Sequence, residues 1–432
     1  MSATIVTCAR ALVDEEERRD FAFAIRDGRI DAIDSAERLR ARFPGAHIRS
    51  HAPDAAVVPG FINGHSHAYQ ILMRGWADDL TFEQWRSDAL YKVVPQLTPD
   101  QIYWTFRLAF DEMLAAGITT VAEFFYLNGA GNAHAEAAIR AARDAGIRLV
   151  FARTWMDAEY APPAFRESID QAQERTSALM RAFPGVEICV APHSLHAASR
   201  DMIRAAAEFA RSQNCMLHVH VAEAQYEGAQ TVERFGQTPI ALLDTLGALN
   251  ERTVAIHAIY ITEEEKRLVA ARGARIIHNP MTNQYLGDGI CDVVGLQQLG
   301  VVMGLGTDAD VKPSILDEMR ACSLLQKVSR LDGSALGAKA AFALGTSQGA
   351  QALRVDAGAL REGAFADYAV IDLSTMDPWI PLCNQVVYRA ESAAVVETYV
   401  GGTLVRSRGD SVPQEAVRSL ASLIRTLGPP HK

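Results

Sequence analysis

Apolar runs of strand length recur through the middle of the chain, roughly every 20 to 40 residues between residues 59 and 360. The clearest runs are 119–122, 149–152, 186–190, 216–220, 253–257, 275–278 and 301–305. Alanine-rich amphipathic segments, for example 134–145 and 199–212, lie between them. Repeated β-α units predict a parallel sheet, and this many units predict a closed (β/α)8 TIM-like barrel of the α/β class. The alternative is a doubly wound open sheet, but no GxGxxG motif follows any of these runs.

Both ends of the chain differ from this middle part because their apolar runs are short and β-like. Near the N-terminus these runs are 5–6, 21–25 and 30–33, with a hairpin-turn signal at Arg26-Asp27-Gly28-Arg29. Near the C-terminus they are 369–372, 386–388 and 395–400, with a turn at Gly401-Gly402. We therefore expect a small β-sandwich domain built from residues 1–58 and 361–432, beside a barrel at 59–360.

The composition excludes several classes of protein. The chain has 432 residues, 49% hydrophobic and 22% charged, so it can bury a core of normal size. Its net charge is −10 and it has no basic block, which argues against a nucleic-acid partner. No stretch of 18 apolar residues occurs, so we expect no membrane span. Six scattered cysteines without CxxC, and an N-terminus unlike a signal peptide, predict reduced thiols and a cytoplasmic location.

Two pairs of alternating histidines stand at the ends of predicted strands. His65 and His67 follow an apolar run, and on a strand their side chains point to the same side, so both can bind one ion. The plain alternative is a pair of surface histidines. In His218-Val219-His220-Val221-Ala222-Glu223, His220 is nearer the carboxyl end of the strand and is our predicted ligand. We interpret His218 as a packed, hydrogen-bonded core histidine. Glu223 is an acid/base residue or, as the alternative, a solvated loop carboxylate.

Two further polar residues close later strands. His257 ends the run 253–257, and Asp308 follows the run 301–305. Either residue alone could be structural, but together with the histidine pairs they form a set in which each polar group closes a separate strand. Neutral imidazoles and a carboxylate suit one divalent metal, zinc or ferrous iron, with water in an open position. Water bound in this way ionises near neutral pH.

The motifs PGFxNGHSH, HVHVAE, AIH and GTDAD resemble the amidohydrolase superfamily, and within it the cytosine deaminase-like group. The resemblance covers essentially the whole chain, including the return at 363–372. It implies a (β/α)8 barrel with one metal. By matching motif, it implies that Glu223 shuttles a proton to the substrate nitrogen and that His257 polarises the attacking water. The implied metal ligands are His65, His67, His220 and Asp308.

One absence supports a single metal. Two-metal members of the superfamily use a carboxylated lysine on a middle strand, and this chain has no lysine between Lys92 and Lys266. Glu123 is the alternative bridging residue. The resulting hypothesis is a mononuclear aminohydrolase in which metal-bound hydroxide attacks an amidine-like carbon, Asp308 accepts the water proton, and ammonia leaves.

Two relatives within the superfamily suggest different small-molecule substrates. The motifs at 65–70, 122–126, 191–195 and 286–290 resemble formiminoglutamate deiminase. That match implies that Gln70, Arg86, Tyr126 and His193 face the substrate, with His196 where the motif carries an arginine. Segments 72–80 and 278–283 instead resemble deaminases of adenosine-type and guanine-type heterocycles. Trp76 and Trp85 then form an aromatic lid over a flat ring, or are packed loop aromatics.

Other functions stay open at this stage. Gly345-Thr346-Ser347-Gln348-Gly349 matches the GxSxG motif of serine hydrolases, which requires a strand before the serine. The preceding run 337–344 is alanine-rich and predicts a helix instead. A non-catalytic barrel scaffold would be expected to lose ligands, and here all are present. A metal-dependent hydrolase that releases chloride or opens a cyclic amide is a third alternative. The family resemblance also implies a homodimer, although no segment marks an interface.

Overall fold

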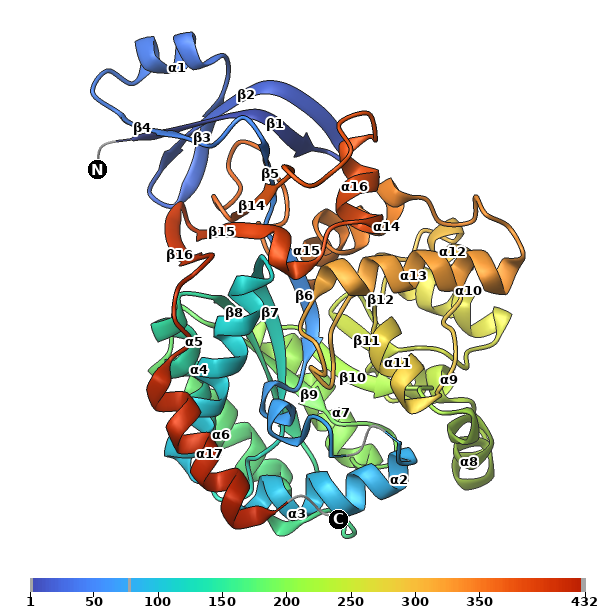
Figure 1. The fold of residues 1–432 in the computed structure, drawn as a ribbon. Helices are drawn as coiled ribbons and strands as arrows, with labels where there is room; N and C mark the ends of the chain where they lie inside the picture. The colour runs from blue at the N-terminus through green and yellow to red at the C-terminus, as the bar shows by residue number, and fades with distance from the viewer. Residues whose placement is uncertain (1–2, 77–78, 429–432) are drawn as a thin grey trace.

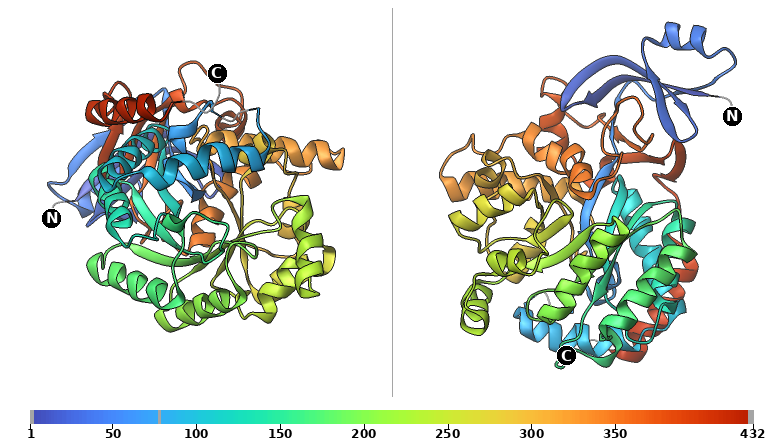
Figure 2. Two further views of the ribbon diagram at one scale, coloured as in Figure 1. Left: turned by 90° about the horizontal axis from the view of Figure 1, so that it is seen from below. Right: turned by 180° about the vertical axis from the view of Figure 1, so that it is seen from behind.

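The computed structural model describes residues 3–76 and 79–428. Its centre is an eight-stranded sheet in which all neighbouring strands are parallel, ringed by helices (Figures 1 and 2). This confirms the predicted (β/α)8 barrel. Its strands are β6 (Phe61–Ser66), β7 (Ile118–Phe125), β8 (Arg148–Trp155), β9 (Glu187–Pro192), β10 (Leu217–Val221), β11 (Thr253–His257), β12 (Arg275–His278) and β13 (Met303–Leu305).

The barrel strands are buried on both faces, since side chains fill the barrel interior and helices cover the outside. β7 and β11, for example, are buried along their whole length. Several outer helices begin at a threonine or serine whose side chain caps the first turn, as Thr98, Ser168 and Thr262 do. The outer helices are α4 (Pro99–Ala115), α5 (Ala133–Ala145), α6 (Ile169–Ala182), α7 (Arg200–Gln213), α8 (Gln225–Phe235), α9 (Pro239–Thr245), α10 (Glu263–Arg272), α11 (Pro280–Leu286), α12 (Val293–Gln298), α13 (Ile315–Arg330), α14 (Ala338–Leu344) and α15 (Ser347–Leu353).

The first and last barrel strands meet at the end where the predicted site residues lie. The backbone N–H groups of Thr307 and Asp308 donate to the carbonyl of His65 at 3.0 and 2.9 Å, and His67 N–H donates to the Asp308 carbonyl at 2.8 Å. Gly306 makes this approach feasible, because a Cβ there would lie 2.7 Å from the backbone nitrogen of His65. Closure of the barrel therefore brings two predicted metal-ligating segments together.

A second sheet of eight strands is built from both ends of the chain, which confirms the predicted terminal β domain (Figure 1). Arg26 pairs with Arg29 across the predicted hairpin turn, and the Gly401-Gly402 turn joins two further strands. Helix α1 (Ala36–Arg42) covers one side of this sheet. The strands are β1 (Thr4–Val13), β2 (Glu16–Arg26), β3 (Arg29–Ile33), β4 (His47–Ser50), β5 (Ala55–Pro59), β14 (Tyr368–Asp372), β15 (Val395–Val400) and β16 (Thr403–Ser407).

The strand predicted at 386–388 is wrong, because these residues lie in helix α16 (Leu382–Tyr388). Val386 and Val387 are fully buried, and α16 packs against α13 and α14. The guanidinium of Arg320 donates to the carbonyl of Val387 at 3.3 Å and to that of Ala390 at 2.5 Å. A cation that binds the last carbonyls stabilises the carboxyl end of a helix, and this contact outweighs the β propensity of two valines.

The terminal sheet and the C-terminal helix both contact the barrel. Arg148 at the start of β8 makes two hydrogen bonds, of 2.9 and 3.1 Å, to the buried carboxylate of Asp367. Helix α17 (Gln414–Leu427) lies along α4 on the outside of the barrel and buries Leu420 and Leu423 (Figure 1). The domain boundaries at 58/59 and 360/361 stay a prediction.

Within residues 3–76 and 79–428, no helix combines the length and apolar character that crossing a bilayer requires. All six cysteines are buried and free, as the scattered spacing predicts.

Candidate active site

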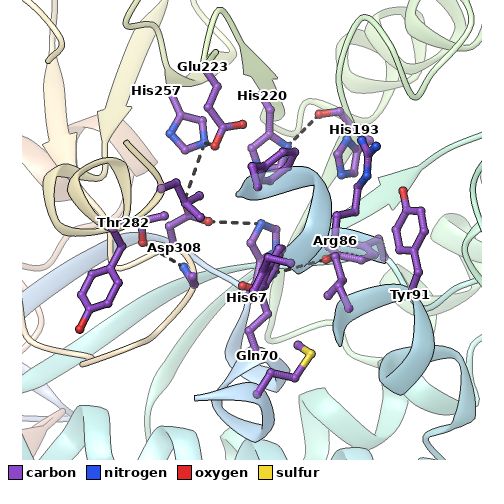
Figure 3. A pocket seen from close by; sticks show the side chains of 18 of the residues that line it. His67, Gln70, Arg86, Tyr91, His193, His220, Glu223, His257, Thr282 and Asp308 are labelled. Carbon is purple, nitrogen blue, oxygen red and sulfur yellow. Dashed lines mark hydrogen bonds and ion pairs between the residues drawn. The ribbon is translucent and has the colours of Figure 1, made fainter. Parts of the chain in front are cut away.

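Five predicted residues meet at the carboxyl end of the barrel strands. Figure 3 shows His67, His220, His257 and Asp308 among them. His65 Nε2 lies 3.3 Å from Asp308 Oδ1, and His67 Nε2 lies 3.5 Å from the same oxygen. His220 Nε2 is 3.2 Å from His65 Nε2. His257 Nε2 is 3.8 Å from Asp308 Oδ2. The set His65, His67 and His220 and the set His65, His257 and Asp308 each bring their ligand atoms within 4.8 Å of one another, which is a spacing compatible with a metal ion.

The hydrogen bonds around two histidines fit a metal site. His67 Nδ1 lies 2.8 Å from the carbonyl of Phe124, and His220 Nδ1 lies 2.9 Å from the carbonyl of His193. A carbonyl only accepts, so each Nδ1 carries the hydrogen and each Nε2 keeps a lone pair facing the cluster. Second contacts of this kind orient metal-binding histidines in known sites. The donor set therefore fits a divalent metal.

Burial and neighbouring charges set the protonation of the cluster. Burial lowers the pKa of His67 to about 3, and burial with the neighbouring histidines lowers that of His220, so both rings are neutral. Burial alone would raise the pKa of Asp308, but the hydrogen bond from His65 and the nearby histidines hold it below its usual range. Burial, with the charges of Asp288 and Asp308, raises the pKa of Glu223 well above its usual range. One carboxyl is therefore kept as an acceptor and the other as a proton donor.

Glu223 and His257 face each other above the cluster. Glu223 Oε1 lies 3.4 Å from His257 Nε2, and the Glu223 side chain is 16% exposed. Three of the strand-end residues have left-handed backbones: Ala222 at φ 52°, His257 at 73° and Asp308 at 50°. Each such residue costs about 1–3 kcal/mol and persists where the surrounding structure fixes it, which is common in active sites. Here the strained turns direct Glu223, His257 and Asp308 into one pocket.

Glu123 supports the histidine segment from behind. Its carboxylate accepts from the Ala68 N–H at 3.0 and 3.2 Å and from the Ser66 hydroxyl at 3.0 Å. The Ser66 hydroxyl also lies 2.6 Å from Asp310 Oδ2. Glu123 belongs to neither of the metal-compatible groups found among the described residues. The structure thus uses Glu123 as a support for the loop that carries His67, not as the bridging carboxylate considered from sequence.

The structure also places His218 and Ser347, for which the sequence suggested a core role and a nucleophilic role. His218 is buried in the barrel, which agrees with a packed core histidine, but the expected hydrogen bond is wrong, because neither ring nitrogen has a partner among the described residues. Ser347 begins α15 directly after α14, and its hydroxyl donates to Glu15 at 3.0 Å. The strand-turn-helix context of a nucleophilic serine is therefore missing, and the serine hydrolase alternative is wrong.

One pocket opens above the cluster, and all the residues predicted to face the substrate line it. Figure 3 shows Gln70, Arg86 and His193 among them. Trp85 lines this pocket, whereas Trp76 is half-buried and packs against the core. Ala77 and Asp78, in the motif at 72–80, lie outside the described residues. The predicted residues on the pocket wall are Gln70, Arg86, Tyr126, His193 and His196.

Several pocket residues had no signal in the sequence. Aromatic rings form much of the wall, and Arg86 lies over the rings of Phe82, Tyr91 and Tyr160 at 5.7 to 5.9 Å. Tyr126 packs edge-on against Phe165 at 5.0 Å. The amides of Asn279 and Asn283 lie 3.2 and 3.1 Å from His257 Nδ1. Only the motif at 278–283 hinted at these two asparagines, through resemblance and not through chemistry.

The chain is similar in sequence to proteins of a known family. The Amidohydrolase family matches residues 56–405, and a bacterial imidazolonepropionase-like composite domain matches residues 22–46. A 5-methylthioadenosine/S-adenosylhomocysteine deaminase of Thermococcus sibiricus is 32% identical over 82% of this chain and 84% of its own. A 5'-deoxyadenosine deaminase of Methanothermobacter thermautotrophicus is 31% identical over 82% of both chains. These names bear out the predicted enzyme class, hydrolases acting on carbon–nitrogen bonds other than peptide bonds.

Solved structures share the fold. The structure of an adenosine deaminase from Xanthomonas campestris with bound zinc superposes with a TM-score of 0.91, at 27% identity, over 99% of this chain and 98% of the other. Atrazine chlorohydrolase from Arthrobacter aurescens complexed with zinc gives 0.88 at 23% identity, over 98% and 100%, and this likeness concerns the fold alone. The match over residues 56–405 and the relatives more than 30% identical establish that this chain belongs to the amidohydrolase family.

Proposed function

We propose that this protein is a mononuclear metal-dependent deaminase of adenosine-type nucleosides. It hydrolyses the bond between the amidine-like carbon of the purine ring and the exocyclic amino nitrogen, and releases ammonia. The observation that carries the proposal is the convergence of His65, His67, His220 and Asp308, linked by distances of 3.2 to 3.5 Å, below a pocket that also holds Glu223 and His257. The names of the relatives, which are deaminases of adenosine derivatives, favour a nucleoside over a formimino compound.

Different residues of this chain carry out metal binding and the two proton transfers. The cluster His65, His67, His220 and Asp308 would hold the metal, which supplies Lewis-acid activation of water when bound. Asp308 accepts a proton from the attacking water, consistent with its lowered pKa. Glu223 delivers a proton to the departing nitrogen, consistent with its raised pKa. Overall one water is consumed, a carbon–oxygen bond forms, the carbon–nitrogen bond breaks, and ammonia leaves.

The pocket wall suits a flat, polar ring. The rings of Phe82, Trp85 and Phe165 provide apolar faces, against which a purine can stack. We propose that the polar side chains predicted from the sequence contact the nucleoside. These are Gln70, Arg86, Tyr126, His193 and His196. Gln70 Oε1 is buried without a hydrogen-bond partner among the described residues, so a substrate donor would satisfy it.

Three finer assignments belong to the same proposal. We propose zinc as the metal, because imidazole and carboxylate donors suit it and a structural relative binds it. A homodimer and a cytoplasmic location are proposed from the family resemblance and from the six free, buried cysteines.

Ammonia release by metal-quantified protein tests the proposal. The panel should include adenosine, 5'-deoxyadenosine, 5-methylthioadenosine, S-adenosylhomocysteine and a formimino amino acid, with chloride release from a chlorotriazine measured in parallel. We expect ammonia from the nucleosides. Glu223→Gln is the matched control, since it keeps the shape but cannot shuttle the proton. It should retain metal and lose about 10²–10⁴-fold in kcat. A protein with about one metal per chain that releases no ammonia from any compound would contradict the proposal.

A further inference from the structure

His257 lies between the cluster and two asparagine side chains of the next barrel unit. On the far side of the ring, Nδ1 is 3.2 Å from Asn279 Nδ2 and 3.1 Å from Asn283 Nδ2. Asn279 precedes the first residue of α11, and Asn283 lies one turn further along. All three side chains are at most 1% exposed, so water cannot substitute for these contacts.

A third residue fixes which way the Asn283 amide points. The same Nδ2 lies 3.1 Å from Asp288 Oδ2, which is a carboxylate oxygen and accepts hydrogen bonds. An amide nitrogen has two hydrogens, so it can donate to Asp288 and to His257 together. Turning the amide over would place its oxygen against the Asp288 carboxylate and leave two acceptors facing each other. The orientation of Asn283 therefore follows from its environment.

An amide donor at Nδ1 determines the tautomer of the His257 ring. Nδ1 must be an acceptor, so it carries no hydrogen, and a neutral imidazole then carries its hydrogen on Nε2. This hydrogen faces the site, with Glu223 Oε1 at 3.4 Å and Asp308 Oδ2 at 3.8 Å. His67 and His220 have the opposite form, because their Nδ1 atoms face backbone carbonyls. The cluster thus contains histidines in two different tautomers, with the ring hydrogen on Nε2 in His257 and on Nδ1 in His67 and His220.

We propose that Asn283, assisted by Asn279, is a positioning residue that locks His257 in the Nε2-protonated form. In this form His257 is a hydrogen-bond donor toward the attacking water and Asp308, and its Nε2 has no lone pair with which to bind a metal. The inference rests on the proposed deaminase function for its catalytic consequence, but the form of the ring can be measured without any substrate.

The direct test is the ¹⁵N NMR spectrum of the metal-loaded protein labelled at histidine. The His257 signals are assigned by their loss in His257→Asn. We expect the ring hydrogen of His257 on Nε2. A hydrogen on Nδ1 in the wild-type protein would overturn the proposal, whatever the enzyme proves to act on. An absence of deaminase activity in wild type would instead count against the proposed function.

The variant that tests this reasoning is Asn283→Asp combined with Asp288→Asn, which exchanges the amide and the carboxylate between the two positions. The pair still holds one carboxylate and one amide, so the local charge is unchanged, but the group facing Nδ1 becomes an acceptor. We expect the His257 hydrogen to move to Nδ1. We expect kcat to fall about 10²–10³-fold, the loss typical of removing one preorganised donor. KM and metal content should stay within about threefold. Asn283→Ala removes the Asn283 donor but adds no acceptor. Its kcat should therefore lie between that of the wild type and that of the double variant. Wild-type kcat in a double variant whose hydrogen has moved would overturn the proposal.

Discussion

Gly306 lies where the barrel closes, directly before the segment of Asp308, and a methyl group there should disturb both fold and site. A Cβ on Gly306 would lie 2.5 Å from Asn279 Oδ1, 2.7 Å from His65 N and 2.8 Å from His65 Cβ. Real Cβ atoms essentially never come within 3.0 Å of another atom, so a shift of a few tenths of an ångström is unavoidable. Since the backbone nitrogen and the Cβ of His65 both take part in the clash, the shift moves a predicted ligand.

The expected size of the effect follows from these contacts. Overpacking of this kind costs about 1–3 kcal/mol. Unfolding entropy is roughly 0.9 kcal/mol/K for 432 residues, so Gly306→Ala should lower Tm by only about 1–3 °C. The metal affinity is the more sensitive measure, because displaced or poorly oriented ligands typically cost about 10–100-fold. Metal affinity is measured by competition for the metal between the metal-loaded protein and a chelator of known affinity. Tm is measured by thermal unfolding.

A second glycine provides the matched control. Gly228 lies inside α8 and has no positive φ, and a Cβ added there would meet no neighbouring atom within 4 Å. Gly228→Ala should therefore stabilise the protein by about 0.5–1 kcal/mol and leave metal affinity unchanged. Equal metal affinity and Tm in Gly306→Ala and wild type would refute the argument that His65 and the Asp308 segment are held together at this point.

Three further predictions concern groups around the site and in the core. Glu123→Ala should weaken metal binding about 10–100-fold in chelator competition. Glu123→Gln still accepts from Ala68 N–H and should keep most of the metal affinity. Equal losses of affinity in the two variants would contradict a positioning role. Glu167→Ala leaves the fully buried Arg153 without its carboxylate and should cost about 3–5 kcal/mol in denaturant unfolding, whereas Asp201→Asn, in an exposed ion pair, should change nothing measurable. Removal of the metal should abolish ammonia release and lower Tm, and zinc should restore both; activity that survives in metal-free protein would rule out the mechanism.

The sequence was most informative where the chemistry is local to one strand. Alternation places His65 and His67 on one side of a chain segment, and the rule that barrel sites lie at the carboxyl ends of strands selects His220 over His218. The two residues are only two positions apart, yet about 7 Å of strand separates them in depth. His220 reaches the cluster and His218 stays in the core. Position along a strand was therefore enough to choose between them.

Contacts between distant segments were beyond the sequence. Glu123 looks like any buried strand carboxylate until β6 and β7 pair and bring the Ser66 hydroxyl and Ala68 N–H to it. Asn283 becomes relevant only because α11 begins beside the end of β11. The wall aromatics Tyr91 and Phe165 lie in short helical turns of the connections that follow β6 and β8, and their ring centroids are 5.7 Å apart. No local pattern marks such residues.

The sequence by itself determined the barrel, the terminal sheet and the set of polar residues at strand ends, because burial periodicity and strand ends are properties of short segments. The tertiary structure decided which groups meet. It turned 386–388 into a helix through Arg320 and brought Glu123 behind the histidine segment. It also set His257 against an amide donor, as opposed to a carbonyl. Each of these outcomes depends on a hydrogen bond between residues far apart in the chain, and only the folded chain brings such partners within reach of each other.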